Sequence, residues 1–277
     1  MPNLEQTRAA WEAQAEAYDE LLTPLCMEAG RRALSLAGVQ RGDKLIDVAC
    51  GGGAVSIPAA ELGADVLAVD YSASMVDLLT RKAGERGLPN LRVRLMDGTA
   101  LDVEAGEFDV GCSQLGIMLF PDRAKGLKEL ARVVRPGGMA VMSVFGPPER
   151  VQPLSLFFEA LAKVVPGAPS PATSPLFCLR DPELLKLEMM EAGFADMEVD
   201  RFETYLETAS ADALWTTVTA GAPAVTGILR SLSEEQRSQV RAALDGLLGA
   251  WAVGAGPMKL PMAFNIGVGV RQAADYP

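Results

Sequence analysis

A regular alternation of short apolar runs with helical or turn-rich segments, between residues 44 and 145, constrains the fold most strongly. The first run, KLIDVA, is followed at once by three glycines, and the second, DVLAVD, ends in an acid. The runs LRVRLM, FDVGCSQ and MAVMSVF follow. Because parallel strands need long crossover connections, this pattern predicts a doubly wound, parallel sheet covered by helices.

The rest of the chain is predicted to surround this core. A proline-rich insertion at 147–178 supports at most one short helix, and the helical stretch at 209–260 has a layout suited to a cap over a cleft. We therefore expect six segments: N-terminal helices that cover the site (1–40), the core (41–146), the insertion (147–178), a crossover helix and strand (179–208), the helical cap (209–260), and the last strand with its tail (261–277).

Composition excludes several mechanisms. The chain has no histidine, which removes histidine-dependent proton transfer and the commonest metal ligand, so we expect no metal site. A net charge of −11 argues against a nucleic-acid partner. Without a CxxC pair, Cys26, Cys50, Cys112 and Cys178 are expected to be buried free thiols of a reducing compartment. No signal peptide or membrane-length apolar span is evident, which predicts a cytoplasmic location.

The glycine loop offers unpaired N–H groups at a helix start, where a ligand can approach the backbone closely. GGGAVSI lacks the lysine of a phosphate loop, and Ser56 stands where a dinucleotide fingerprint has its third glycine. The carboxylate of Asp47 would repel a pyrophosphate, which favours a ligand with an ammonium or sulfonium group. Asp70 follows at the usual distance for an acid that binds the hydroxyls of a ribose.

Four motifs, DVACGGG, VLAVDYS, LMDGTAL and RPGG, follow one another along the chain. They resemble the successive motifs of class I S-adenosylmethionine-dependent methyltransferases, and are most similar to the small-molecule branch related to the ubiquinone and menaquinone methyltransferases. The resemblance covers residues 1–146 well and the rest in outline. It implies an α/β fold with a doubly wound, Rossmann-like sheet of about seven mostly parallel strands, an antiparallel last strand and a helical cap.

The same resemblance implies an enzyme that transfers a methyl group from S-adenosylmethionine to an O, N or C atom of a small, partly apolar molecule, with S-adenosylhomocysteine as product. Asp47 would help to hold the amino group of the methionine part, Asp70 the ribose hydroxyls, and Asp97 the adenine amino group. Tyr18 would cover the cofactor, although core packing explains this residue equally well. The full cofactor set implied is Tyr18, Asp47, Ala49, Gly51, Gly53, Asp70, Tyr71, Ser72, Met75, Met96, Asp97, Gly98, Ser113 and Gln114.

Acceptor choice is predicted in the segments that depart from the shared pattern. Met118, Phe177 and Trp215 are candidate acceptor residues, and filling the core of the cap is an equally good interpretation of the aromatic ones. No catalytic base is singled out, because aligning the acceptor and excluding water can suffice for a sulfonium donor. Two alternatives stay open: a cofactor-binding enzyme of non-methylating chemistry, such as cyclisation or isomerisation, and an NAD-dependent oxidoreductase. A homodimer is compatible with the sequence.

Overall fold

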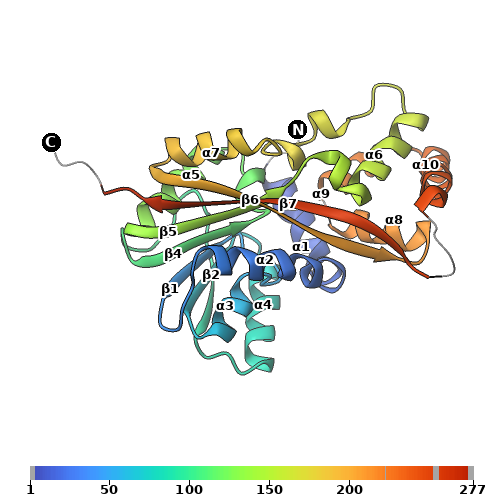
Figure 1. Cartoon of the computed structure of the whole chain (residues 1–277). Helices are drawn as coiled ribbons and strands as arrows, with labels where there is room; N and C mark the ends of the chain where they lie inside the picture. Colours follow the sequence, from blue (N-terminus) through green and yellow to red (C-terminus); the bar gives the residue numbers. More distant parts are fainter. Residues whose placement is uncertain (1–3, 222, 252–255, 274–277) are drawn as a thin grey trace.

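The computed structural model describes residues 4–221, 223–251 and 256–273 (Figure 1). In this part of the chain, seven strands form one sheet in the order β3-β2-β1-β4-β5-β7-β6. The first five strands are parallel, and β7 runs antiparallel to both of its neighbours. This arrangement confirms the predicted fold class. The strands are β1 (Lys44–Val48), β2 (Asp65–Asp70), β3 (Leu91–Leu95), β4 (Phe108–Gln114), β5 (Val134–Phe145), β6 (Phe194–Thr208) and β7 (Met258–Arg271).

Helices cover both faces of the sheet (Figure 1). One face carries α2 (Thr23–Leu36), α3 (Ser56–Leu62) and α4 (Ala73–Glu85), and the other carries α5 (Arg123–Val133) and α7 (Pro182–Glu191). Three of these helices begin at side-chain caps, in which the cap accepts a backbone N–H of the first turn. The caps are Ser72 for α4, Asp122 for α5 and Asp181 for α7.

The N-terminal segment forms two helices. A single residue separates the first, α1 (Leu4–Leu21), from α2, and Pro24 lies in the first turn of α2. Proline is tolerated in the first turn of a helix, where its missing N–H would have no partner. α1 packs against α4 and α8, and therefore bridges the sheet core and the cap. Within the described residues, no helix is long and apolar enough to cross a membrane.

The insertion and the cap form one helical layer. The insertion contributes α6 (Gln152–Val164), and the cap contributes α8 (Ala211–Gly221), α9 (Pro223–Arg230) and α10 (Glu234–Leu248). α6 packs against α10 and α8, although they lie far apart in the sequence. The two segments that the sequence treats as separate are thus a single packed unit.

The two last strands form a long hairpin that carries this layer. β6 and β7 pair from Phe194↔Arg271 to Thr208↔Met258, whereas β5 pairs with β7 only as far as Phe145↔Phe264. The outer part of the hairpin therefore projects beyond β5, with the cap helices at its far end (Figure 1).

Candidate active site at the glycine loop

The glycine loop follows β1 and leads into α3. Gly51 and Gly53 have φ values of +50° and +87°, a region that side-chain-bearing residues rarely adopt. A Cβ on Gly53 would lie 2.4 Å from Leu79 Cδ1, and a Cβ on Gly52 would lie 2.4 Å from Asp19 Oδ1. The loop is therefore restricted to glycine both by its backbone conformation and by close packing.

Two buried carboxylates lie at this loop. Asp47 accepts a hydrogen bond of 2.5 Å from Ser56 Oγ, and burial raises the pKa of Asp47 to about 7. Asp70 accepts backbone N–H groups of Gly51 and Ser72, each at 3.0 Å, and burial raises its pKa as well. No basic side chain of the described residues pairs with either acid. Two buried acids without a counter-ion favour a cationic ligand at this position.

Further residues of the predicted cofactor set lie at and after the ends of β2 and β3. Tyr71 is half-buried, whereas Met75 is buried against α1. Met96 is buried, and its N–H donates to the backbone oxygen of Asp70 at 2.9 Å, which ties the two strand ends together. Asp97 is exposed and accepts the N–H of Thr99 at 2.8 Å.

Gly98, the last of this predicted group, is buried. A Cβ at Gly98 would lie 2.6 Å from the ring of Phe120 and 2.7 Å from Val48, so the backbone here is packed too tightly for a side chain. These residues of the predicted cofactor set thus share one corner of the sheet, and their contacts with a cofactor stay a prediction.

Backbone strain marks the ends of β1 and β4. Ala49 and Leu115 have φ values of +60° and +55°, which is uncommon for residues with a side chain and clusters at functional sites. Ser113 Oγ is buried and accepts the N–H of Ile117 at 3.1 Å. Gln114 Nε2 donates to the Cys26 carbonyl at 2.7 Å, while its buried Oε1 has no hydrogen-bond partner in the described structure. Local sequence patterns predict the position of these residues but not the strain.

Helix α1 covers the loop. The Tyr18 ring lies 3.7 Å from the position that a Cβ on Gly51 would occupy, and meets Trp11 edge-on at a centroid distance of 5.5 Å. Both rings pack against a small apolar cluster that includes Met75. Tyr18 thus both packs in a cluster and lies over the loop, so the structure is compatible with the two interpretations that the sequence left open.

A polar contact fastens α1 in this position. Asp19 forms an ion pair with Lys82 on α4, and Lys82 Nζ also donates to the Gly52 carbonyl at 2.7 Å. We call these three residues the latch. Both charged side chains are largely buried, at 19% and 13% exposure. Sequence reasoning missed the latch, because no local pattern signals a pair that only tertiary packing brings together.

The predicted acceptor residues lie in and near the cap layer. Met118 is buried in the main core. Phe177 packs against Phe145 at a centroid distance of 6.0 Å, and Trp215 packs against Phe157 at 6.1 Å. These contacts fit core packing, and a role in acceptor binding stays a prediction.

All four cysteines are free thiols. Cys26, Cys50 and Cys112 are buried as predicted, and burial raises the pKa of each thiol. Cys178 departs from the prediction because it is only partly buried, with Arg123 Nη1 at 3.6 Å from its sulfur. The raised pKa of Cys50 makes this residue of the glycine loop a poor nucleophile. The described residues hold no cluster of potential ligands suited to a metal ion.

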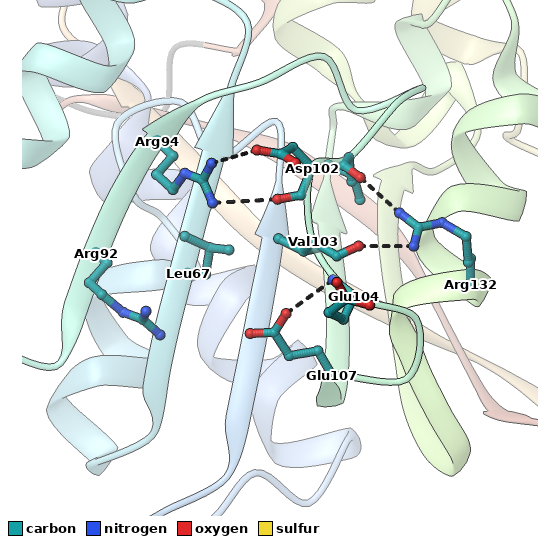
Figure 2. A pocket seen from close by; sticks show the side chains of 9 residues that line it. Leu67, Arg92, Arg94, Asp102, Val103, Glu104, Glu107 and Arg132 are labelled. Atoms are coloured by element: carbon teal, nitrogen blue, oxygen red, sulfur yellow. Dashed lines mark hydrogen bonds and ion pairs between the residues drawn. The ribbon is translucent and has the colours of Figure 1, made fainter.

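A cavity of about 480 Å³ opens beside β2 and β3 (Figure 2). Its charged lining is already engaged: Arg94 pairs with Asp102 at 3.0 Å, and Arg132 donates to the Val103 carbonyl at 2.9 Å. Arg132 lies near the end of α5, beside the amino end of β5, whereas the glycine loop lies at the carboxyl end of β1. These are opposite ends of the parallel strands, so this cavity is separate from the candidate active site.

Comparison with known proteins agrees with this geometry. Residues 46–142 match the model of a methyltransferase domain family. The chain is 37% identical over 161 residues to nocamycin O-methyltransferase of Saccharothrix syringae, covering 57% of this chain and 56% of that protein. It is 29% identical over 174 residues to demethylmenaquinone methyltransferase of Renibacterium salmoninarum, covering 61% and 71%.

Among solved structures, phosphoethanolamine N-methyltransferase 2 of Haemonchus contortus, in complex with S-adenosyl-L-methionine, has a TM-score of 0.54 at 17% identity; the match covers 89% of this chain and 53% of that one. At this identity the likeness shows the fold alone. The chain spans about half the length of the curated relatives it matches. The matched domain contains the glycine loop, both buried acids and the ends of the first four strands. Residues 46–142 therefore match a methyltransferase domain, which supports the resemblance of the chain to the class I S-adenosylmethionine-dependent methyltransferases.

Proposed function

We propose that this protein transfers a methyl group from S-adenosylmethionine to a small, largely apolar molecule. The observation that carries the proposal is the pair of buried acids, Asp47 and Asp70, beside a tightly packed loop that only glycine fits. A ligand with an ammonium, a sulfonium and a ribose has the groups that such a site would bind.

The residues around the loop fit this cofactor in a second way. Thr23 Oγ1 and Gln114 Oε1 are buried and have no hydrogen-bond partner in the described structure. A buried polar atom without a partner costs about 1–3 kcal/mol, so these two atoms favour a polar ligand. Asp47 would face the ammonium in its ionised form, Asp70 would accept the ribose hydroxyls, and α1 would exclude water above them.

The bound cofactor would supply an electrophilic methyl group, so the task left to the protein is to orient the acceptor and keep the site dry. No histidine is available as a base, and burial raises the pKa of Tyr18, so the tyrosine is suited to covering rather than to accepting a proton. Alignment by the apolar cap is the contribution that these residues can make.

The named relatives support a small-molecule acceptor, since one is named for nocamycin and the other for demethylmenaquinone. We also propose a cytoplasmic location, because the four free thiols suit a reducing compartment. Sedimentation of the purified chain would show whether it is a monomer or the homodimer that the sequence allows.

Calorimetric titration tests the cofactor. Saturable binding of S-adenosylhomocysteine with none of NAD is the expected result, and the reverse pattern would support the oxidoreductase alternative. A screen of acceptors with methyl-labelled S-adenosylmethionine then tests the reaction. Transfer of label to a product supports the proposal, whereas a product formed without label while the cofactor is bound would favour cyclisation or isomerisation.

A further inference from the structure

A small apolar cavity lies between the N-terminal helices and the cap. Its volume is about 50 Å³, and none of the described side chains that line it is charged. The walls come from the α1–α2 corner, the end of β5, and the insertion and cap; they include Leu22, Leu25, Phe145, Leu154, Leu176 and Val218. An apolar cavity of this kind stays dry and binds apolar groups.

The cavity adjoins the glycine loop through the α1–α2 corner. Leu22 lines the cavity, and the next residue, Thr23, is the one whose Oγ1 would lie 2.4 Å from a Cβ on Gly52. The same short turn therefore contacts the loop on one side and the cavity on the other.

Three buried polar atoms without a partner come from the elements that adjoin the loop and the cavity. Ser143 Oγ is buried without a hydrogen-bond partner in the described structure, as are Thr23 Oγ1 and Gln114 Oε1. Ser143 and Gln114 are partners in neighbouring strands, and Phe145, two residues beyond Ser143, lies on the same face and lines the cavity. A hydroxyl on an apolar body could thus meet polar atoms at the loop end while its hydrocarbon part enters the cavity.

Two residues of the cavity wall, Leu22 and Gly221, are in close contact. A Cβ on Gly221, at the end of α8, would lie 1.9 Å from Leu22 Cδ1, so the leucine side chain fills the notch that this glycine leaves. Ligand sites are typically about 300–1,000 Å³, so the wall has to move apart when a ligand enters, and this contact lies within the wall.

We propose that this cavity binds the hydrocarbon body of an uncharged methyl acceptor, and that Leu22 against Gly221 controls its entry. This inference rests on the proposed methyl transfer. It commits to an acceptor without a carboxylate, phosphate or ammonium on the part that enters the cavity, because no side chain in its wall could compensate a buried charge.

Equilibrium dialysis at pH 7 with two matched probes tests the proposal, using protein saturated with S-adenosylhomocysteine. The probes are 2-naphthol and 6-hydroxy-2-naphthoate, which differ only by a carboxylate. We expect 2-naphthol to bind more tightly, by roughly tenfold or more. Leu154→Trp, which fills the cavity, should weaken 2-naphthol binding roughly tenfold, and Leu22→Ala, which opens it, should strengthen binding about threefold.

Leu187→Trp is the matched control, because Leu187 on α7 is 50% exposed and lies outside the cavity wall; it should leave both affinities unchanged. Affinity for S-adenosylhomocysteine, measured in parallel, shows that each variant is folded. Equal binding of the two probes, or naphthol binding that responds to neither cavity variant, would overturn the cavity assignment while the cofactor still binds. If the unaltered protein does not bind S-adenosylhomocysteine, the proposed function itself is overturned.

Discussion

The glycine-loop side of the site and the cap side are built from opposite chemistry. On the loop side, Asp47 and Asp70 are buried, and both carboxylates accept directed hydrogen bonds. On the cap side, Phe145, Leu154 and Val218 contribute an apolar wall without charges. Directed bonds depend on a few residues that have no substitute, whereas apolar contacts are shared among many. Cofactor recognition should therefore be sensitive to single changes, and acceptor recognition should shift gradually.

The largest expected effect is the loss of a carboxylate on the loop side. Asp70→Ala should weaken binding of S-adenosylhomocysteine by about 1.5–3 kcal/mol for each charge-assisted hydrogen bond lost. It also removes the acceptor for the N–H groups of Gly51 and Ser72, so thermal stability should fall. Calorimetry measures the first effect. An unchanged affinity in a folded variant would mean that the ribose site lies elsewhere.

Asp47 should give the loop side a pH dependence that the cap side lacks. Folding raises its pKa from 3.8 to about 7, so the folded chain holds this proton more tightly than the unfolded chain. The resulting stabilisation is complete below the ordinary pKa and is lost as pH rises through about 7. At about 1.4 kcal/mol per pH unit, the loss between pH 5 and pH 8 is of the order of 3 kcal/mol.

Urea unfolding at these two pH values measures this loss, and Asp47→Asn is the control because it cannot ionise. The same pH dependence in both proteins would assign the effect to other groups. Binding of S-adenosylhomocysteine should strengthen over the same range, because its ammonium pairs with ionised Asp47.

Glycine-to-alanine substitutions test how well the loop side and the cap side accommodate an added methyl group. Gly53→Ala places a Cβ 2.4 Å from Leu79 at a φ of +87°, and overpacking of this kind costs about 1–3 kcal/mol of unfolding free energy. Gly246 in the cap helix α10 has open space, with nothing within 4 Å of the position that a Cβ would occupy. Gly246→Ala should therefore stabilise the protein by about 0.5–1 kcal/mol. Chemical denaturation measures both, and equal effects would remove the contrast between the regions.

The smallest expected effect concerns the latch. Lys82→Met breaks a largely buried pair with Asp19 and the bond to the Gly52 carbonyl, and should cost about 1 kcal/mol in affinity for S-adenosylhomocysteine, seen mainly as faster dissociation. Arg81→Met is the matched control, because Arg81 joins the same two helices through Glu16 but is 51% exposed. An exposed pair contributes about 0–1 kcal/mol. Stopped-flow dissociation rates that rise equally in both variants would show that burial of the latch has no special role.

The features that the sequence predicted well are those set by neighbours in the chain. The glycine loop after β1, and the acids Asp47 and Asp70 near the ends of β1 and β2, follow from a few adjacent residues. The strand ends are predicted less accurately. β5 begins at Val134, because the RPGG residues belong to the strand and form an irregularity in its pairing with β4. Local propensity does not specify where pairing with a neighbouring strand stops.

The sequence indicates that the cap is apolar, but it does not show how the cap helices are oriented. Trp215 and Phe177 stand out by residue type, and their role in acceptor binding stays a prediction. Leu22, Leu154 and Val218, which line the cavity, carry no signal in the sequence. Which side of a helix faces a cavity depends on partners distant in sequence. The contact of Leu22 with Gly221 and the latch share this origin, since each joins segments that meet only in the folded chain.

The β6–β7 hairpin bears on how such an enzyme could acquire a new acceptor. The cap leaves the sheet after Thr208 and returns at Met258, and these two residues are paired partners in adjacent strands. The cap between them is therefore joined to the sheet at two positions that are already neighbours. The entropic cost of closing a loop grows only slowly with its length. The cap helices could therefore be lengthened, shortened or replaced as one module by recombination at this junction, while the cofactor-binding sheet is inherited intact.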